Sequence, residues 1–354
     1  MMPELAVQSK PETLCIVRLS AIGDTCHALA VIRRLQDNWP GVKITWIIGK
    51  VEASLMSDIP GVEFIILDKS EGRRAFKEVR NQLQGRRFDI ALCMHASLRA
   101  NLLCRSIPAE IRLGFDRARA RDFQLLFTNE RIPAASHEHA LDAMMAFATS
   151  IGAAPRELRW DIPLPDAARQ FANQYIDERR PLVVISPCSS QRSRNYRNWS
   201  IENYAAVIEH LQQVHGCTVV LTGGASELEL EYGNALSNGP SERLKNLVGK
   251  TILKELLALI QVADLVICPD SGPAHMATSV GTAVIGLYAT SNPDRTGPYL
   301  SRELTVNRYP DAARQFLGRE ADHLRWGQRV RHAAAMNLIT IDDVAAKIDL
   351  FFAR

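Results

Sequence analysis

Short apolar runs with strand character alternate with longer amphipathic segments along most of this chain, and this alternation limits its fold more than any other feature. In the first half, strands are predicted at residues 14–18, 44–48, 64–67 and 88–93. The helix predicted at residues 25–36 places Leu29, Ile32 and Leu35 on one face. Strands that alternate with helices in this way form βαβ units around a parallel sheet.

The alternation weakens between about residues 112 and 165, where prolines interrupt it, and then begins again. In the second half, strands are predicted at residues 182–186, 218–221, 265–268 and 283–287, and helices at 201–214, 227–236 and 252–261. A length of 354 residues suits two domains. We therefore predict an α/β protein with Rossmann-like domains at residues 1–170 and 171–325, and a helical segment at 326–354 that packs back across both.

Composition and patterning indicate a soluble globular protein. Hydrophobic residues make up 47% of the chain and charged residues 23%. Residues 1–12 are polar, and no apolar run approaches the roughly 18 residues of a membrane-spanning helix, so we expect a cytoplasmic protein whose membrane contact is peripheral. No Cys-x-x-Cys pair occurs, and Cys15, Cys93, Cys217 and Cys268 lie in or beside strand-like runs, so we expect core cysteines without zinc or disulfides.

Positive charge is concentrated in one part of the chain. The net charge is +3, yet residues 69–131 contain 14 Lys or Arg and 7 Asp or Glu, which gives this window +7 and the remainder −4. The window could be a set of solvated helix faces, or it could be a basic surface that meets an anionic partner.

Ligands of open α/β sheets bind at the carboxyl ends of the strands, so the loops that follow strands are the candidate sites. The first such loop reads Arg-Leu-Ser-Ala-Ile-Gly-Asp-Thr-Cys-His over residues 18–27. Gly23 would allow a tight turn near a ligand. Asp24 either caps the following helix or acts as a general base, and His27 is expected to be a packed helix residue.

Two loops in the second half have features of nucleotide sites. Residues 268–277, Cys-Pro-Asp-Ser-Gly-Pro-Ala-His-Met-Ala, lead from a strand into a helix whose unpaired N–H groups and dipole suit a diphosphate. The chain contains no Walker loop. Residues 222–227, Thr-Gly-Gly-Ala-Ser-Glu, bring Glu227 either to ribose hydroxyls or to the cap of the next helix.

A third loop, residues 186–199, combines hydroxyl groups with positive charge. The residues concerned are Ser189, Ser190, Arg192, Arg194 and Arg197. They suit phosphate oxygens, although an ordinary basic surface loop would have the same composition.

The order of these loops resembles one enzyme family. Arg-Leu-Ser-x-x-Gly-Asp near the N-terminus and Asp-Ser-Gly-Pro-x-His about 250 residues later are similar to the paired motifs of glycosyltransferase family 9, the ADP-heptose:lipopolysaccharide heptosyltransferases. The resemblance covers nearly the whole chain, and residues 14–30 and 45–53 look most like heptosyltransferase I, which adds the first heptose to Kdo. It implies the GT-B fold, in which two Rossmann-like domains face a central cleft, the first binding the acceptor and the second the nucleotide sugar.

The resemblance also implies an inverting reaction with Asp24 as the catalytic base. The carboxylate would take the proton of the acceptor hydroxyl while that oxygen attacks the anomeric carbon opposite ADP. Because ADP is already an acceptable leaving anion, no second acid is needed, in contrast to inverting glycosidases. The chain contains no Asp-x-Asp triplet, so we expect catalysis without a metal ion or an organic cofactor.

Binding residues are implied in both halves. Those implied for the donor are Ser189, Ser190, Arg197, Glu227, Thr251, Asp270, Ser271, Gly272 and His275. Those implied for the acceptor are Arg73, Arg74, Lys77, Arg99 and His139. Arg197 replaces a family lysine, the loop at residues 191–196 is longer than the family's, and Glu229 competes with Glu227. A Kdo-lipid A acceptor would give the +7 window its anionic partner, at the cytoplasmic face of the inner membrane.

Other functions match these residues less well. Within the family, addition of the second heptose by a heptosyltransferase II and a non-catalytic nucleotide-binding module remain open. An NAD-dependent oxidoreductase is disfavoured because residues 18–24 lack Gly-x-Gly-x-x-Gly. A nucleic-acid binder could use the basic window, but the strongest motifs suit a small ligand, so no nucleic acid is expected as a partner. The oligomeric state stays open.

Overall fold

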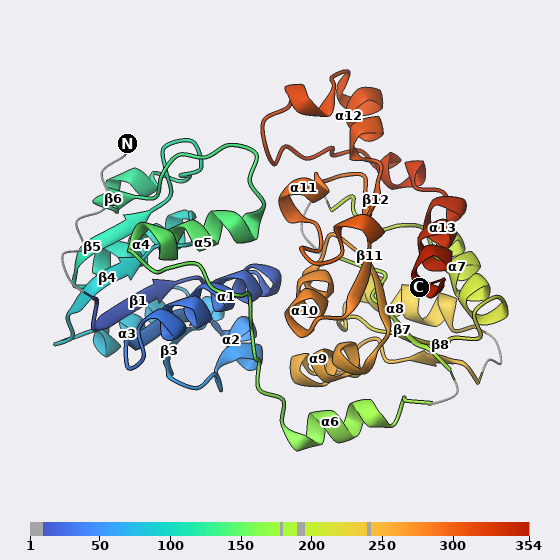
Figure 1. Ribbon diagram of the computed structural model, residues 1–354, viewed down its shortest axis with the longest axis horizontal. Coiled ribbons are helices and arrows are strands. Elements are labelled where there is room, and N and C mark those ends of the chain that lie inside the picture. Colours follow the sequence, from blue (N-terminus) through green and yellow to red (C-terminus); the bar gives the residue numbers. More distant parts are fainter. Residues whose placement is uncertain (1–9, 178–179, 190–194, 239–241, 354) are drawn as a thin grey trace. The chain divides into compact units, whose positions relative to one another are not determined.

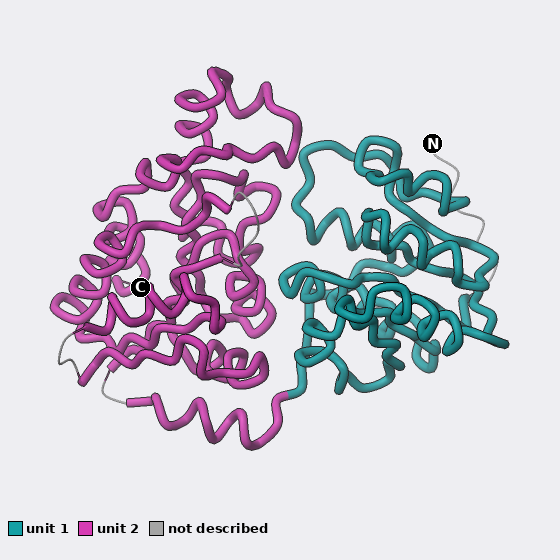
Figure 2. The backbone as a smooth tube through the Cα atoms, turned by 180° about the vertical axis from the view of Figure 1, so that it is seen from behind, with its two compact units in different colours: residues 1–163 teal, residues 164–354 magenta. Residues whose placement is uncertain are grey.

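The structure is a computed structural model that describes residues 10–177, 180–189, 195–238 and 242–353. It contains two compact units, residues 1–163 and residues 164–354, which are coloured separately in Figure 2. Each unit holds a six-stranded sheet whose neighbouring strands pair in parallel. Among the described residues, no helix combines the length and the hydrophobicity that a membrane span requires.

The first unit is built on a doubly wound sheet (Figure 1). Its strands lie in the order β3 (Val62–Leu67), β2 (Lys43–Gly49), β1 (Thr13–Val17), β4 (Phe88–Leu92), β5 (Ala109–Gly114) and β6 (Glu130–Arg131). Its helices are α1 (Ile22–Asn38), α2 (Lys50–Met56), α3 (Arg73–Gln82), α4 (Leu98–Ser106) and α5 (Ala140–Ser150), with short 3-10 turns η1 (Lys69–Glu71) and η2 (Gln124–Leu126).

The second unit repeats this plan (Figure 1). Its strands lie in the order β12 (Val306–Asn307), β11 (Ala283–Tyr288), β10 (Leu265–Pro269), β7 (Leu182–Ile185), β8 (Thr218–Leu221) and β9 (Leu244–Asn246). Its helices are α6 (Asp166–Asn173), α7 (Ile201–Gln213), α8 (Glu227–Leu236), α9 (Leu253–Val262), α10 (Gly272–Val280), α11 (Pro293–Thr296), α12 (Tyr309–Leu317) and α13 (Ile341–Phe352). Its 3-10 turns are η3 (Arg302–Leu304), η4 (Ala321–His323) and η5 (Ala335–Leu338).

Apolar strand residues form the core of each unit, as expected for parallel strands covered by helices. In the first unit, Cys15 of β1 packs in one cluster with Val79 of α3 and Leu103 of α4. In the second unit, Val183 of β7 belongs to a cluster that includes Ile348 of α13. Helix α13 contacts α7, β11 and β12, so it is anchored on the sheet of its own unit.

The sequence pattern predicts the central elements correctly. All eight predicted strands are present, and α13 lies within the helical segment predicted at residues 326–354. Strands β5, β6, β9 and β12 are not predicted. Strands β6, β9 and β12 contain only two or three residues, whereas β5 has the polar–apolar alternation of a half-buried strand and is missed because only continuous apolar runs are taken as strands. The tight turn expected at Gly23 is wrong: the carbonyl of Ala21 already accepts from the N–H of Thr25, so α1 begins at Ile22 and contains Gly23.

The prediction that the cysteines are core residues is confirmed. All seven cysteines are buried and carry free thiols. Burial raises the pKa of the Cys268 thiol to about 12, and it raises the pKa of Cys15 as well. These thiols are small core residues that stay protonated.

Each sheet reverses its strand order at one point. Strands β2 and β3 lie on one side of β1, and β4, β5 and β6 lie on the other. In the second unit, β8 and β9 lie on one side of β7, and β10, β11 and β12 lie on the other. Rossmann-like sheets bind ligands beyond the carboxyl ends of the two strands that flank such a switch point. The loops after β1 and β4, and those after β7 and β10, are therefore the candidate sites.

Candidate functional site

The loop after β1 holds an arginine–aspartate pair. Arg18 follows the last residue of β1, and its Nη2 contacts Oδ2 of Asp24. Arg18 Nη1 also donates to the carbonyl oxygen of Met94, 2.7 Å away, in the loop after β4. The Arg18 side chain is 11% exposed, whereas the Asp24 side chain is 37% exposed. The arginine therefore fixes the position of a carboxylate that stays open to solvent.

Asp24 is also part of the start of α1. Its Oδ2 accepts a hydrogen bond from the backbone N–H of Ala21, the N-cap residue, at 3.2 Å. A carboxylate in the first turn is favoured by the N–H groups and the dipole of the helix. The position of Asp24 is thus compatible with both predicted roles, helix cap and general base, because the capping contact leaves the carboxylate accessible.

His95 lies beside this pair, although no sequence motif singles it out. Its Nδ1 accepts a hydrogen bond from the backbone N–H of Leu19 at 3.2 Å, so the neutral ring carries its proton on Nε2. Burial, followed by the positive charge of Arg18, lowers the pKa of His95 to about 3. The ring is therefore neutral near neutral pH. Its place directly after the strand predicted at residues 88–93 is the signal that could have identified it.

The acceptor candidates of the first unit lie in two different environments. Those exposed on α3 and α4 are Arg73, Arg74, Lys77 and Arg99. His139 is instead 3% exposed, and its Nδ1 accepts from an N–H of the first turn of α5 at 3.1 Å. Its ring lies edge-on to His27, which is packed in α1 as expected. The structure therefore gives His139 a role at the start of α5 and presents the four cations to solvent.

A second arginine–aspartate pair lies at the switch point of the second unit. Arg197 Nη1 donates to the backbone carbonyl oxygen of Asp270 at 2.7 Å and lies 3.5 Å from its Oδ2. The same Oδ2 accepts from the hydroxyl of Ser291 at 2.9 Å and lies 3.8 Å from Nη2 of Arg329. Ser291 and Arg329 are absent from the sequence motifs. Ser291 lies in the loop after β11, as the motif residues lie in the loops after their strands. This position could have identified it as a candidate site residue.

The loop after β7 is held by amide side chains. Ser189 Oγ donates to Oδ1 of Asn195 at 2.9 Å, and the N–H of Ser189 donates to Oδ1 of Asn198 at 2.9 Å. The buried hydroxyl of Ser189 is therefore engaged within its own loop. Ser190, predicted for the donor, and residues 191–194 lie outside the described residues.

The acidic side chain over the glycine loop after β8 belongs to Glu229. Its Oε1 accepts from the N–H of Gly224 at 2.7 Å, and its Oε2 accepts from the hydroxyl of Ser226, the N-cap of α8. Glu227, predicted for the donor, is exposed at the first position of α8. The geometry therefore favours Glu229 over Glu227 for the position near this loop.

The start of α10 offers backbone donors. The hydroxyl of its N-cap, Ser271, donates to the carbonyl oxygen of Pro269 at 3.1 Å and gives no side-chain cap to the first-turn N–H groups. Gly272 opens the helix and His275, its fourth residue, is buried. N–H groups and a helix dipole at such a position favour a negatively charged ligand. Thr251 precedes α9, which contacts α10.

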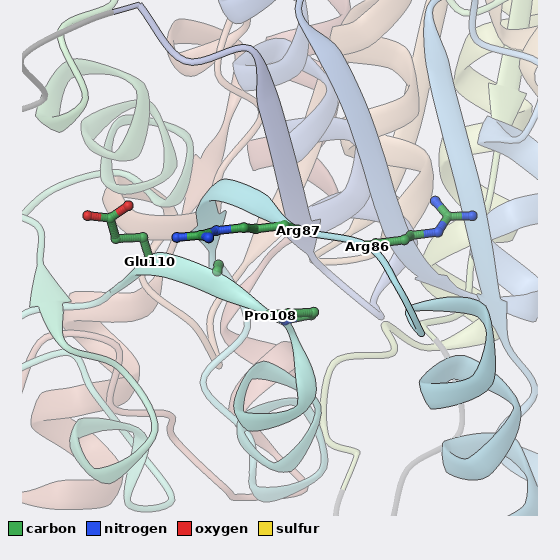
Figure 3. A pocket seen from close by; sticks show the side chains of 5 residues that line it. Arg86, Arg87, Pro108 and Glu110 are labelled. Carbon is green, nitrogen blue, oxygen red and sulfur yellow. The ribbon is translucent and has the colours of Figure 1, made fainter.

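A surface pocket of the first unit lies away from these loops (Figure 3). It is lined by Arg86, Arg87, Pro108, Ala109 and Glu110. Arg86 and Arg87 precede β4 and Pro108 precedes β5, so the pocket lies at the amino ends of the strands, opposite to the switch point. Arg86 and Arg87 point in opposite directions, and Arg86 donates to both carboxylate oxygens of Glu63. The pocket is thus separate from the candidate site.

One side-chain group in the described part of the chain has ligand atoms close enough together for a metal ion. Nε2 of His210 and Nε2 of His215 each lie 2.7 Å from Oδ1 of Asp349. This group joins the end of α7 to α13. Because α7 runs back from the carboxyl end of β7, its own end lies toward the amino ends of the strands. The group is therefore distant from the loops that form the candidate site.

The two switch points differ in the chemistry that they offer. The first presents an accessible carboxylate, Asp24, held by a buried guanidinium, which suits proton abstraction. The second presents the N–H groups of α10 and the guanidinium of Arg197, which suit phosphate oxygens. Transfer from a nucleotide-activated donor would use groups of these two kinds, a carboxylate for the acceptor proton and cationic or N–H donors for the phosphates.

Known proteins are similar to this chain over most of its length. A sequence model of glycosyltransferase family 9 (heptosyltransferase) matches residues 76–322. The lipopolysaccharide core heptosyltransferase OpsX of Haemophilus influenzae is 39% identical over 96% of this chain and 96% of the relative. Lipopolysaccharide heptosyltransferases 1 and 2 of Escherichia coli K12 are 23% and 26% identical, over 80% and 83% of this chain and 90% and 87% of the relatives.

Solved structures share the fold. A family 9 glycosyl transferase from Veillonella parvula superposes with a TM-score of 0.77 at 19% identity, over 98% of this chain and 99% of that chain. The E. coli heptosyltransferase WaaC with ADP superposes with a TM-score of 0.73 at 20% identity, over 96% of this chain and 99% of that chain. These likenesses, together with the two parallel sheets, confirm the predicted GT-B fold class.

Proposed function

The chain belongs to glycosyltransferase family 9, and from this premise we propose that it transfers a heptose from ADP-heptose to the inner core of lipopolysaccharide. The observation that carries the proposal is an arginine–aspartate contact at the switch point of each unit, between Arg18 and the accessible Asp24 in the first and between Arg197 and Asp270, beside the start of α10, in the second. The identity of 39% with a lipopolysaccharide core heptosyltransferase over nearly the whole chain supports the substrate class.

The second unit would hold the donor. The N–H groups of α10 and the guanidinium of Arg197 would bind the diphosphate of ADP-heptose. Asp270 is 8% exposed and accepts from Ser291, so its carboxylate can orient the Arg197 guanidinium, whose Nε also donates to Oδ1 of Asn195 at 3.3 Å. The further donor residues are Ser189, Ser190, Thr251, Ser271, Gly272 and His275, with Glu229 in the place expected for Glu227.

Departure of ADP needs stabilisation of the negative charge that builds on its phosphate oxygens. Fixed backbone donors and a fixed guanidinium supply this stabilisation without reorganising during the reaction. Arg197 is held by the carbonyl of Asp270 at 2.7 Å and is 12% exposed, so it is already ordered before the donor binds. We therefore expect transfer without a divalent metal ion.

The first unit would supply the base. Asp24 would take the proton from the acceptor hydroxyl while that oxygen attacks the anomeric carbon from the face opposite ADP, which inverts the configuration. Arg18 holds the carboxylate in place, and neutral His95 adds no second positive charge beside it. A single carboxylate suffices, because the leaving group needs no protonation.

The acceptor would be the Kdo region of lipid A, held by the exposed cations of the first unit. Arg73, Arg74 and Lys77 on α3 and Arg99 on α4 follow β3 and β4, so they extend from the same edge of the sheet as Asp24. Guanidinium groups bind carboxylates and phosphates bidentately, which matches Kdo carboxylates and lipid A phosphates. His139, a buried cap, remains a weaker candidate. The protein would work at the cytoplasmic face of the inner membrane.

The heptose that is transferred would be the first one. The motifs at residues 14–30 and 45–53 favour a heptosyltransferase I. Overall identity does not separate the two activities, because the E. coli heptosyltransferases 1 and 2 are 23% and 26% identical to this chain.

The test is a transfer assay on purified protein with ADP-heptose and two acceptors, Kdo-bearing lipid A and the same acceptor that already carries one heptose. Release of ADP with the first acceptor only, at equal rates with and without EDTA, is expected. Turnover only on the heptosylated acceptor would make the protein a heptosyltransferase II, and a need for a divalent ion would contradict the metal-free reaction. No turnover with either acceptor would contradict the function itself.

A further inference from the structure

The two most exposed large apolar side chains among the described residues lie three positions apart in the first unit. Leu126 is 77% exposed and Phe123 is 73% exposed, and both belong to the segment around η2. Leu98 and Leu102, four positions apart on α4, are 50% and 47% exposed. Scattered apolar side chains are common on protein surfaces, but a group of them on neighbouring elements marks an interaction surface.

Helix α4 holds the turn that carries Phe123. The buried Asn101 of α4 donates through Nδ2 to the carbonyl oxygens of Arg121 and Asp122, at 3.2 and 2.8 Å. Asp122 Oδ2 in turn accepts from the backbone N–H of Leu98 at 3.0 Å. These bonds place Leu98 and Phe123 on adjoining parts of one surface. We name the side chains of Leu98, Leu102, Phe123 and Leu126 the apolar face.

The backbone at this turn adopts an unfavourable conformation. Asp122 and Phe123 have φ values of 51° and 62°, in the left-handed region that side-chain-bearing residues rarely occupy. The next residue, Gln124, is buried, and its Nε2 donates to the carbonyl oxygen of Cys93 at 2.9 Å. The polar Gln124 is thus inside and its apolar neighbour Phe123 is outside, the reverse of the usual arrangement. Strained backbone clusters at functional positions, so this conformation supports a role for the solvent-exposed Phe123.

The charge around the apolar face is positive. Residues 98–127 contain six Arg, three acidic residues and no Lys. One of the acids, Asp116, pairs with Arg119. The exposed arginines of this segment are Arg99, Arg105, Arg117 and Arg121. Apolar side chains flanked by guanidinium groups are complementary to an anionic lipid surface, whose acyl region takes the former and whose headgroups take the latter.

We propose that the apolar face docks the protein on an anionic lipid bilayer, with Phe123 and Leu126 entering the acyl boundary. This inference rests on the proposed function, in which the acceptor is a lipid. Leu98 lies three positions after His95, at the edge of the sheet that carries Asp24. Docking through this face would bring the base to the membrane surface from which the acceptor sugar projects.

The test is co-flotation of the full-length protein with vesicles of neutral phosphatidylcholine and with vesicles that contain 30 mol% phosphatidylglycerol. The variant is Phe123→Ser/Leu126→Ser. Its matched control is Val51→Ser/Ile66→Ser, which removes apolar side chains that are 62% and 44% exposed elsewhere in the same unit. Thermal unfolding of each variant verifies that it is folded.

Wild type and the control are expected to bind the anionic vesicles, and the Phe123→Ser/Leu126→Ser variant is expected to bind them at least about tenfold more weakly, since each buried apolar side chain contributes to partitioning. Arg117→Gln/Arg121→Gln should remove the preference for anionic over neutral vesicles. Equal binding by variant and control would overturn the proposal. So would a dimer in light scattering that Phe123→Ser/Leu126→Ser dissociates without a change in vesicle binding, because a second copy would then cover the face.

Enzyme assays separate this inference from the function on which it rests. On a deacylated, water-soluble acceptor, Phe123→Ser/Leu126→Ser should retain wild-type turnover, and on vesicle-bound acceptor its turnover should fall. If the protein binds vesicles through this face but transfers no heptose, the proposed function is refuted and the proposed docking surface is not. Equal turnover on vesicle-bound acceptor, with unchanged binding, would refute the docking surface alone.

Discussion

The two units build the same contact at their switch points and use it differently. In each unit, an arginine from the loop after the first strand donates through Nη1 to a backbone carbonyl beyond the neighbouring strand, at 2.7 Å: Arg18 to Met94 and Arg197 to Asp270. Each arginine also meets an aspartate. Asp24 lies in the first turn of the helix that follows its own arginine, whereas Asp270 follows the neighbouring strand β10.

The exposure of the two carboxylates is the main difference. The Asp24 side chain is 37% exposed, and the Asp270 side chain is 8% exposed and accepts a further bond from Ser291. A carboxylate that must exchange a proton with substrate needs access, and one that orients a cation needs burial and partners. We therefore propose that the aspartate of the first unit is reactive and that the aspartate of the second unit is structural.

Asparagine substitutions at the two aspartates give the largest expected contrast. Asp24→Asn should lower kcat about 10³-fold with little effect on the donor KM, because it removes the base and leaves the helix start intact. Asp270→Asn should instead raise the donor KM and lower the melting temperature, because Arg197 loses its orienting charge. Initial rates of ADP release and thermal unfolding measure these effects. A larger loss of kcat in Asp270→Asn would reverse the assignment of the two carboxylates.

Arg197 offers the next contrast, between donor and acceptor binding. Arg197→Ala should raise the donor KM roughly 10- to 100-fold, the range expected for loss of charge-assisted hydrogen bonds to a phosphate. Arg197→Lys should recover part of this loss, since it restores charge without the bidentate geometry. Arg73→Ala/Arg74→Ala is the matched control in the first unit and should raise the acceptor KM instead. An increase in acceptor KM for Arg197→Ala would place the acceptor in the second unit.

These contrasts depend on residues that the sequence reveals to different degrees. The central strands were predictable because their apolar runs are long and buried on both faces, and the motif loops followed from their ends. Arg197 and Asp270 were predictable as members of motifs. Their mutual contact was not, because it joins loops that are 73 positions apart and depends on how β7 and β10 pair.

Single residues in the site were harder to predict for a different reason. The contact between His95 and the backbone N–H of Leu19 leaves no pattern in the sequence, so only the position of His95 after a predicted strand could have identified it. Glu227 and Glu229 differ by only two positions, and the choice between them depends on the direction of the first turn of α8. Ser190 has the right chemistry but lies outside the described residues.

His95 distinguishes the first switch point by its response to pH. Its folded-state pKa of about 3 lies below the ordinary value of 6.5, so the unfolded chain binds a proton that the native protein does not between these values. The contribution of the neutral ring to the free energy of unfolding is fully present above pH 6.5 and is lost as the pH falls toward 3. From pH 7 to pH 5, wild type should lose about 1–2 kcal/mol more stability than His95→Asn, whose amide oxygen can replace Nδ1.

Urea unfolding at several pH values, with both proteins measured in parallel, tests this expectation. Asp270→Asn is a useful reference, because it perturbs the second unit and should not change the pH slope that His95 produces. Parallel slopes for wild type and His95→Asn would mean that the ring titrates normally and is not held neutral by burial and Arg18.

The smallest expected effect concerns the two glutamates of α8. Glu229 binds the N–H of Gly224 and the hydroxyl of Ser226, so Glu229→Ala should loosen the glycine loop and raise the donor KM about fivefold, equivalent to about 1 kcal/mol. Glu227→Ala leaves these bonds in place and should change the donor KM less than twofold, as is usual for an exposed side chain. Both variants keep a good helix former, which makes them a matched pair.

Isothermal titration with ADP measures the donor affinity of both variants directly. If Glu227→Ala weakens ADP binding more than Glu229→Ala, the exposed carboxylate contacts the ribose as the motif implied, and Glu229 only caps the helix. The second unit would then resemble the first more closely, because each would present an accessible acid from the first turn of a helix to its substrate.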